Sequence, residues 1–391
     1  MTVLTDQDAA FLADVVEVAD TIAKIHADDV DRNARFPVEA IDALRERRAL
    51  SAFVPTDLGG DGVSLRAIAT ACFELGRRCG ASGMVFAMHQ IQVVTIVRHL
   101  DAQGADSFFH EHLRAVASDQ RLIASVTSEV GTGGDMGRSV AALTPGGDGT
   151  ASFEKQAPTV SYGAYADDLL TTLRASPDAG PGDQVAALTR NDQHTLEQKG
   201  TWDPLGMRGT CSPGYVVRAT LSPDQVLAAP FATIMTESMV PVSHILWSHL
   251  WLGVATDAFD RARAFVRAAA RQKPGEPIPA ALRLSHVMSD LSLLRAEVRG
   301  ALDEFLASED RERMATMAFA LRFNNLKLAA SEQAPRVCQG ALTTTGIVGF
   351  KNDTPFSVGR HLRDAMSACL MVANDRIHQT NAGLLLIAKD V

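Results

Sequence analysis

The sequence predicts an α+β fold in which a middle antiparallel β domain separates an N-terminal helical domain from a C-terminal four-helix bundle. Apolar residues recur at helical spacing to about residue 120, short β-rich runs follow to about residue 227, and helical spacing returns from about residue 233. Helices and strands thus occupy separate blocks, which is typical of α+β folds and not of alternating βαβ folds. We expect three domains, over residues 1–121, 122–232 and 233–391.

The first block carries apolar residues three and four positions apart, which places them on one helical face. The first such set is Phe11, Val15, Val18 and Ile22. A cluster of turn-forming residues, Val54-Pro-Thr-Asp-Leu-Gly-Gly-Asp-Gly, then interrupts the helices. Further on, His110 and His112 lack the partners and spacing of a zinc site. We expect them on a solvated helix face, and we expect no metal site in the chain.

The middle block contains short runs rich in Val, Thr, Leu and Tyr, separated by Gly, Pro and Asp. Such runs predict the strands of an antiparallel sheet or a small barrel. Clear examples begin at Thr159, Asp168, Val185 and Tyr215.

The last block returns to helical spacing in long, rarely interrupted patterns. One apolar stripe contains Leu291, Leu294, Val298, Leu302 and Phe305. Long helices with short connections predict an antiparallel four-helix bundle.

Composition excludes several function classes. The formal net charge is −9, whereas nucleic-acid and membrane-surface binders present a basic face, so we expect neither partner. The five cysteines are scattered without a Cys-x-x-Cys pair, which favours free thiols in a reducing compartment. The sequence shows no secretory signal pattern and no apolar run near the roughly 20 residues of a membrane span, so we expect a cytoplasmic protein.

The segment from Ile123 to Gly137 is the most informative part of the chain. An apolar run leads into two hydroxyl residues, a carboxylate at Glu129 and a glycine-rich turn that Asp135 closes. Glycines let the backbone approach a ligand closely, and successive N–H groups in such a turn can bind an anion. The spacing differs from the dinucleotide fingerprint Gly-x-Gly-x-x-Gly, so a Rossmann domain is disfavoured. A simple glycine hairpin turn remains an alternative.

Three other motifs occur in a fixed order around this turn: the Val54 cluster, Leu205-Gly-Met-Arg-Gly-Thr and Leu362-Arg-Asp-Ala. Together with Ser128-Glu-Val-Gly-Thr-Gly-Gly-Asp, which is similar to the family pattern Thr-Glu-Pro-Gly-x-Gly-Ser-Asp, they resemble the acyl-CoA dehydrogenase family of flavoproteins. The resemblance covers essentially the whole chain. It implies FAD bound between the middle and C-terminal domains of a homo-oligomer, a tetramer or dimer, whose subunits share the cofactor sites.

The resemblance also assigns cofactor contacts within the middle domain. It implies that Thr127 and Ser128 face the flavin ring and that Gly133 and Gly134 approach the pyrophosphate. Ser161 matches a hydroxyl position beside the flavin. Position 159 holds a threonine, Thr159, where an aromatic residue often covers the ring.

Four further contacts are implied in the C-terminal block. Arg271 resembles the arginine that reaches the FAD of a neighbouring subunit, and Gly346 matches the adenine-side loop. Thr343 replaces a frequent glutamine in that loop, and Asn374 stands where a threonine usually touches the cofactor.

The usual catalytic base is missing from the family pattern. Dehydrogenation of an acyl thioester needs a base that removes the Cα proton while a hydride leaves Cβ. The family glutamate position is Val372 here, and the second family location, around Pro241 and His244, holds no carboxylate. That same region usually supplies an Asp/Arg pair for the thioester arm.

Three residues are candidates for the missing base. Asp375 lies about one helical turn beyond Val372 and could equally be a surface charge paired with Arg376. His244 could act as a neutral base or could simply be packed in the core. His89 lies on a helix that borders the active site in this family, and flavin monooxygenases of the same fold use histidines near the flavin.

These observations lead to three functional hypotheses. The first is a FAD-dependent oxidoreductase that oxidises an acyl thioester, free or carrier-bound, or a related small hydrophobic substrate with a non-standard base, and that passes electrons to an acceptor. The second is a flavin-dependent monooxygenase that receives reduced flavin from a separate reductase, with His89 or His378 near the reacting site. The third is a catalytically silent subunit of a hetero-oligomeric dehydrogenase.

Overall fold

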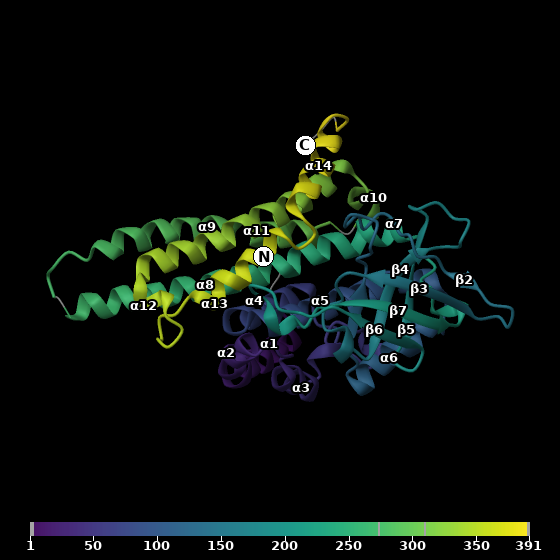
Figure 1. Cartoon of the computed structure of the whole chain (residues 1–391), viewed down its shortest axis with the longest axis horizontal. Coiled ribbons are helices and arrows are strands. Elements are labelled where there is room, and N and C mark those ends of the chain that lie inside the picture. The colour runs from purple at the N-terminus through teal and green to yellow at the C-terminus, as the bar shows by residue number, and fades with distance from the viewer. Residues whose placement is uncertain (1–3, 273, 309, 389–391) are drawn as a thin grey trace.

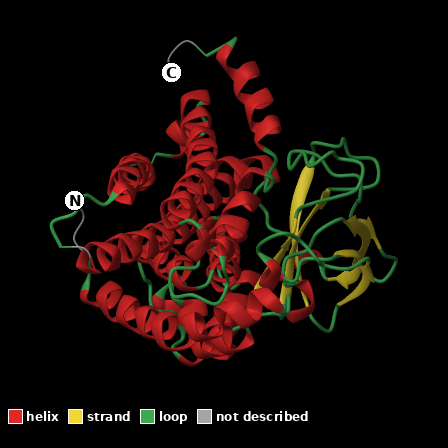
Figure 2. Ribbon diagram, turned by 60° about the vertical axis from the view of Figure 1, so that its left-hand side comes forward, coloured by secondary structure: helices red, strands yellow, loops and turns green. Residues whose placement is uncertain are grey.

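The computed structural model describes residues 4–272, 274–308 and 310–388. Within these residues, a helical block, a block of strands and a second helical block follow one another along the chain (Figure 1). The strands gather on one side of the helices (Figure 2). The predicted α+β class is therefore confirmed.

The N-terminal block forms a group of helices around α5. Thr5 and Asp8 form a capping box that starts the first helix. The helices are α1 (Asp6–Val18), α2 (Lys24–Arg32), α3 (Val38–Glu46), α4 (Leu65–Arg78), α5 (Gly80–Arg98) and α6 (Phe108–Asp119).

Helix α5 corrects one expectation from the sequence. It is long and apolar enough to cross a membrane by length and composition, although we expected no such segment. In the folded chain 89% of its apolar window is buried, so it forms the core of the N-terminal block. The expected solvated face at His112 is also wrong. His112 is 1% exposed, and burial lowers its pKa to about 3, which keeps the ring neutral.

The middle block contains two sheets, with strand orders β1-β4-β5 and β2-β3-β7-β6. The strands are β1 (Ile123–Val126), β2 (Thr144–Pro145), β3 (Ala151–Ala157), β4 (Asp168–Arg174), β5 (Gln184–Arg190), β6 (His194–Lys199) and β7 (Gly214–Leu221). Their ladders are antiparallel except for one: β1 pairs with β4 in parallel, with Ile123 opposite Asp168. The purely antiparallel prediction fails there because residues 127–167 form a long crossover, which parallel pairing requires.

The C-terminal block is built on three long helices, α8, α9 and α11. Two shorter helices, α13 and α14, pack against α11 in place of a fourth long helix. The predicted four-helix bundle is thus interrupted in its last member, where Val372 and Ala373 have φ values of 57° and 33°. The helices are α7 (Phe231–Ile234), α8 (Val240–Gln272), α9 (Pro279–Leu306), α10 (Arg311–Met314), α11 (Met317–Thr345), α12 (Ile347–Phe350), α13 (Gly359–Met366) and α14 (Asn374–Leu385).

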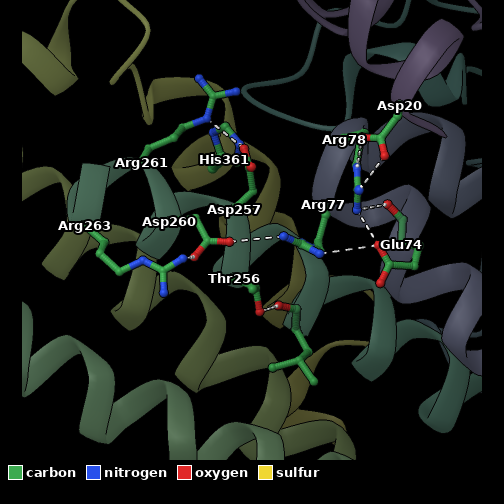
Figure 3. Close-up of polar contacts among 11 residues, drawn as sticks. Asp20, Glu74, Arg77, Arg78, Thr256, Asp257, Asp260, Arg261, Arg263 and His361 are labelled. Atoms are coloured by element: carbon green, nitrogen blue, oxygen red, sulfur yellow. Dashed lines mark hydrogen bonds and ion pairs between the residues drawn. The ribbon is translucent and has the colours of Figure 1, made fainter. Parts of the chain in front are cut away.

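Helices α4 and α8 join the two helical blocks at close range. A Cβ on Gly76 of α4 would come within 2.5 Å of the Leu250 carbonyl oxygen, so the helices meet where a side chain is absent. Ion pairs continue this contact (Figure 3): Arg77 of α4 reaches Asp260 of α8 at 3.1 Å. Further along, Asp257 accepts a hydrogen bond of 2.7 Å from His361, which attaches α13 to α8.

A loop from the middle block is held against α13 by a buried carboxylate. Asp364 accepts a hydrogen bond of 2.7 Å from the backbone N–H of Met207, and Arg363 donates to the Leu205 carbonyl at 2.9 Å. Gly206 lies so close to the Arg363 carbonyl that a Cβ there would collide with it. Burial raises the pKa of Asp364 to about 6, although Arg360 and the Met207 N–H favour its charged form. The motifs Leu205-Gly-Met-Arg-Gly-Thr and Leu362-Arg-Asp-Ala therefore meet in space.

We expect Asp364→Asn to make the stability of the protein less dependent on pH. In the folded chain Asp364 holds its proton up to about pH 6, whereas an unperturbed carboxyl releases it near 3.8. This group therefore stabilises the fold below about pH 4, and that contribution is lost as the pH rises through about 6. An asparagine keeps an acceptor for Met207 without a charge. In urea unfolding, the free energy of unfolding of the variant should increase relative to that of the wild type as the pH rises from 4 to 7.

The control for this prediction is Asp364→Ala, which leaves the buried Met207 N–H without an acceptor. We expect it to be about 1–3 kcal/mol less stable than Asp364→Asn at every pH in that range, because both variants lack the titrating group and differ in the acceptor alone. A difference between Asp364→Asn and wild type that stays constant with pH would contradict the assignment.

Candidate functional site

A cavity of about 470 Å³ lies where the three blocks meet, within the range of small-molecule and cofactor sites. Helices α5 and α8, together with Met239 directly before α8, form an apolar wall that also includes Met84, Met88, Ile91 and Trp247. The segment after β1, the loop before β7 and the α13–α14 segment complete the lining. The site is therefore mostly apolar and carries its hydroxyl groups largely on the β side.

Five of the ten expected cofactor residues line this cavity: Thr127, Ser128, Gly134, Thr159 and Ser161. Ser128 Oγ donates to the Thr159 carbonyl at 2.6 Å, which joins the segment after β1 to the segment after β3. Ser161 Oγ accepts a hydrogen bond of 3.0 Å from Ser212. Thr127 Oγ1 has no hydrogen-bond partner among the described residues and is free to meet a ligand.

Arg376 contacts the glycine-rich turn, whose glycines leave the backbone uncovered by side chains. Gly133 and Gly134 have φ values of 61° and 84°, a conformation that side chains other than glycine rarely adopt. Arg376 of α14 donates to the Gly133 carbonyl at 2.6 Å and approaches Asp135 at 3.5 Å. A Cβ on Gly133 would stand 3.2 Å from the guanidinium. Bare glycine backbone and a positive charge together fit a phosphate group.

Glu129 supports the turn from inside and does not line the cavity. Its carboxylate accepts hydrogen bonds from the backbone N–H groups of Val140 and Ala141 at 3.0 and 2.5 Å. Lys155, which is fully buried on β3, lies 3.6 Å from this carboxylate and donates to the Thr172 carbonyl at 2.6 Å. Burial lowers the pKa of Lys155 to about 8, an effect that the nearby Glu129 opposes. Lys155 thus braces the segment that carries Thr127.

The three base candidates do not belong to the residues that line the cavity. His89 is fully buried: its Nε2 donates to the Leu50 carbonyl at 2.8 Å, and its Nδ1 accepts from the Ile123 N–H at 3.0 Å. His244 donates from Nδ1 to the Phe323 carbonyl at 3.0 Å. Burial lowers the pKa of His89 to about 4 and that of His244 to about 3, so both rings are neutral. Asp375 is exposed on α14.

Val372 does line the cavity. It sits at the break between α13 and α14 in a left-handed conformation that is unfavourable for a β-branched residue. Among the described lining residues, Asp135 is the one carboxylate, and it is engaged by Arg376 and by the Gly137 N–H at 3.0 Å. The cavity therefore presents an apolar valine side chain at the break between α13 and α14.

The remaining four cofactor candidates lie elsewhere. Arg271, Thr343 and Gly346 stand near the ends of α8 and α11, at the end of the bundle that points away from the strands (Figure 1). Within a single chain they cannot contact a ligand in the cavity. Lys273, beside Arg271, lies outside the described residues.

Asn374 is occupied by contacts inside the chain. Its Oδ1 accepts a hydrogen bond of 2.5 Å from Lys327, and its Nδ2 donates to Ser331 at 3.1 Å. Lys327 is buried on α11, and this burial lowers its pKa to about 8. The Lys327–Asn374 contact fixes the chain directly after the strained Val372–Ala373 turn.

Reasoning from the sequence missed Arg376, Lys155 and Lys327. Lysines inside otherwise apolar or β-rich runs were the available signal for the last two, because a buried amine needs partners. Arg376 gave no local signal, since its role depends on where α14 packs. No group of three or more His, Cys, Asp or Glu side chains suited to a metal ion occurs in the part of the chain that the structure describes.

Comparison with known proteins agrees with this architecture. Residues 5–118 match the family described as acyl-CoA dehydrogenase, N-terminal domain. The probable acyl-CoA dehydrogenase YngJ of Bacillus subtilis (strain 168) is 24% identical over 351 residues, covering 87% of this chain and 87% of that protein.

Two solved structures show the same fold. FMN-bound TdsC from Paenibacillus sp. A11-2, a dibenzothiophene monooxygenase, matches with a TM-score of 0.82 at 20% identity, covering 96% of this chain and 97% of that one. Butyryl-CoA dehydrogenase from Megasphaera elsdenii matches with a TM-score of 0.80 at 19% identity, covering 99% of this chain and 100% of that one. The chain is a distant member of the acyl-CoA dehydrogenase family of flavin-dependent oxidoreductases.

We expect Lys155→Met to destabilise the protein strongly and to weaken the site. The change leaves Glu129 buried beside an apolar side chain, and breaking a buried pair in this way costs about 3–5 kcal/mol. Urea unfolding measures the loss. The double variant Lys155→Met/Glu129→Gln should recover part of it, because the glutamine removes the unpaired buried charge and keeps one acceptor oxygen for one of the two N–H groups that Glu129 binds. If the single and double variants lose the same free energy of unfolding, Lys155 and Glu129 do not stabilise the protein as a pair.

Proposed function

We propose that this chain binds a flavin in the cavity and acts as a flavin-dependent monooxygenase on a small hydrophobic substrate. The observation that carries the proposal is that Val372 lines the cavity. A valine cannot accept a proton, and none of the three base candidates lines the cavity. Chemistry that needs no carboxylate base at this wall therefore suits the site better than removal of a proton from Cα.

The hydrogen-bonding groups on the β side of the cavity suit a flavin. Thr127, Ser128 and Ser161 supply hydroxyl and backbone groups for the ring, while Gly134 and Arg376 suit a phosphate. An FMN would find these contacts within one chain. A FAD would extend further, and Arg271, Thr343 and Gly346 of a second copy would be needed to hold its adenosine part. We therefore propose a flavin site with a homo-oligomer as its full form.

The residues of this chain would bind substrate and exclude water. The apolar wall of α5 and α8 holds a hydrophobic molecule, and the loop anchored by Asp364 closes the side formed by Leu205 and Met207. A reduced flavin, when bound, supplies two electrons and activates O₂, so that one oxygen atom enters the substrate and the other leaves as water. Exclusion of bulk water matters because it protects such reactive species from unproductive decay.

A dehydrogenase acting on an acyl thioester is a second candidate, favoured by one observation. Asp135 is a carboxylate within the described lining, so a proton acceptor is not wholly missing from the cavity. Its contacts with Arg376 and the Gly137 N–H favour a structural role.

The experiment that separates these functions starts from the purified protein loaded with FMN or FAD. We expect flavin binding, no anaerobic bleaching by butyryl-CoA, and, with reduced flavin and isotopically labelled O₂, transfer of the label to an apolar aromatic probe such as indole. Mass spectrometry detects the labelled product. Rapid anaerobic bleaching by butyryl-CoA would instead establish the dehydrogenase. Bound flavin without either reaction would indicate a silent subunit, and failure to bind either flavin would overturn the proposal as a whole.

We expect Val372→Glu to introduce dehydrogenase chemistry. A positioned general base contributes roughly a hundredfold or more to rate, and glutamate tolerates the φ of 57° no worse than valine does. The measurement is the anaerobic bleaching rate with the N-acetylcysteamine thioester of butyrate, which does not need contacts to the CoA arm. Val372→Gln is the matched control because it has the same size without the charge. Wild type that bleaches as fast as Val372→Glu would contradict the role assigned to this wall.

A further inference from the structure

The wall between α5 and α8 carries polar atoms that have no hydrogen-bond partner in the described part of the structure. The two helices run antiparallel: a Cβ on Gly80 would stand 3.5 Å from Val254, and His99 contacts Ser238 at 3.0 Å. Between these two fixed points, Gln92 of α5 falls opposite Ser243 of α8. Both residues line the cavity, in a wall otherwise made of methionine, isoleucine and tryptophan.

Gln92 offers an acceptor. It is 2% exposed, and its Nε2 donates to the Met88 carbonyl at 3.1 Å, which sets the orientation of the amide. Its Oε1 has no hydrogen-bond partner in the described structure. An unpaired buried acceptor is costly, so a ligand that donates to it gains affinity.

Ser243 and Trp247 offer the complementary groups one helical turn apart. Ser243 is 5% exposed, and its hydroxyl has no hydrogen-bond partner among the described residues. Other hydroxyls on the same helix do bond to the preceding turn, as Thr256 does to the Leu252 carbonyl at 2.7 Å. The buried Trp247 Nε1 likewise lacks an acceptor in the described structure. One wall thus contains an acceptor, a hydroxyl and a donor without partners in the described structure. Gln92 Oε1 and Trp247 Nε1 lie beneath the surface of this wall, so a ligand in the cavity reaches them once these side chains rotate.

We propose that Gln92, Ser243 and Trp247 form a recognition site for one polar group on an otherwise hydrophobic substrate, a group that donates and accepts a hydrogen bond at once. A hydroxyl or a carboxamide meets this requirement, whereas a plain hydrocarbon leaves all three side chains unpaired. The substrate class is therefore a small apolar molecule with such a group. The inference rests on the proposed function only in placing the substrate in this cavity.

A binding experiment on the protein as purified tests the site without turnover. The probes are para-cresol, para-methylanisole and para-xylene, which share a ring and methyl group and carry a hydroxyl, an acceptor-only ether and no polar group. We expect para-cresol to bind about tenfold more tightly than para-xylene, with para-methylanisole between them, by ligand-observed NMR. The variants Gln92→Leu and Ser243→Ala should each reduce the ratio of the para-cresol affinity to the para-xylene affinity several-fold. Neither variant should change the affinity for para-xylene.

The matched control is Thr95→Val. Thr95 lies three residues from Gln92 on α5, is equally buried and unpartnered, and does not line the cavity. Its substitution should leave the ratio unchanged. Equal binding of the three probes to wild type, or a Thr95→Val ratio that falls as far as that of Gln92→Leu, would overturn the proposal. Because no step needs a bound flavin, a failure here is separate from a failure of the monooxygenase.

Discussion

The contact on which the site depends is the buried hydrogen bond between Asp364 and the Met207 N–H. It joins the last helices to the loop before β7 at a point where Gly206 allows backbone to touch backbone. This contact brings two segments that are far apart in the sequence together at the edge of the cavity. Burying a carboxylate is costly, and the positive charge of Arg360 offsets part of this cost by favouring the ionised form of Asp364.

The two sides of the cavity are supported independently. The β side depends on the Lys155–Glu129 pair, which lies within the middle block and braces Thr127. The opposite side depends on Lys327 and Asn374, which hold the break between α13 and α14. A change in one support therefore leaves the other in place. The β side of the cavity can therefore keep its arrangement while the residue at position 372 changes.

Sequence reasoning predicted the local features of the site and failed where orientation was needed. Thr127, Ser128 and Gly134 follow one another along a single segment, so a motif is enough to place them together. His89 was different, because α5 is apolar on every side and periodicity cannot say which face meets the cavity. Met88 and Gln92 turned out to line it, and His89, between them on the helix, points into the core. The same limit applies to Arg376 and to the parallel pairing of β1 with β4, which depend on packing across the chain.

The interruption between α13 and α14 decides how residue 372 meets the cavity. An unbroken helix would keep residue 372 in an ordinary helical conformation, whereas the break gives it a φ of 57° and places it in the cavity lining. The break is held by Lys327, Ser331 and Asn374, none of which involves the side chain at position 372. The backbone strain of this turn is therefore present whichever residue occupies position 372. With valine at this position, the cavity has an apolar surface at the break, and the monooxygenase that we propose depends on this surface.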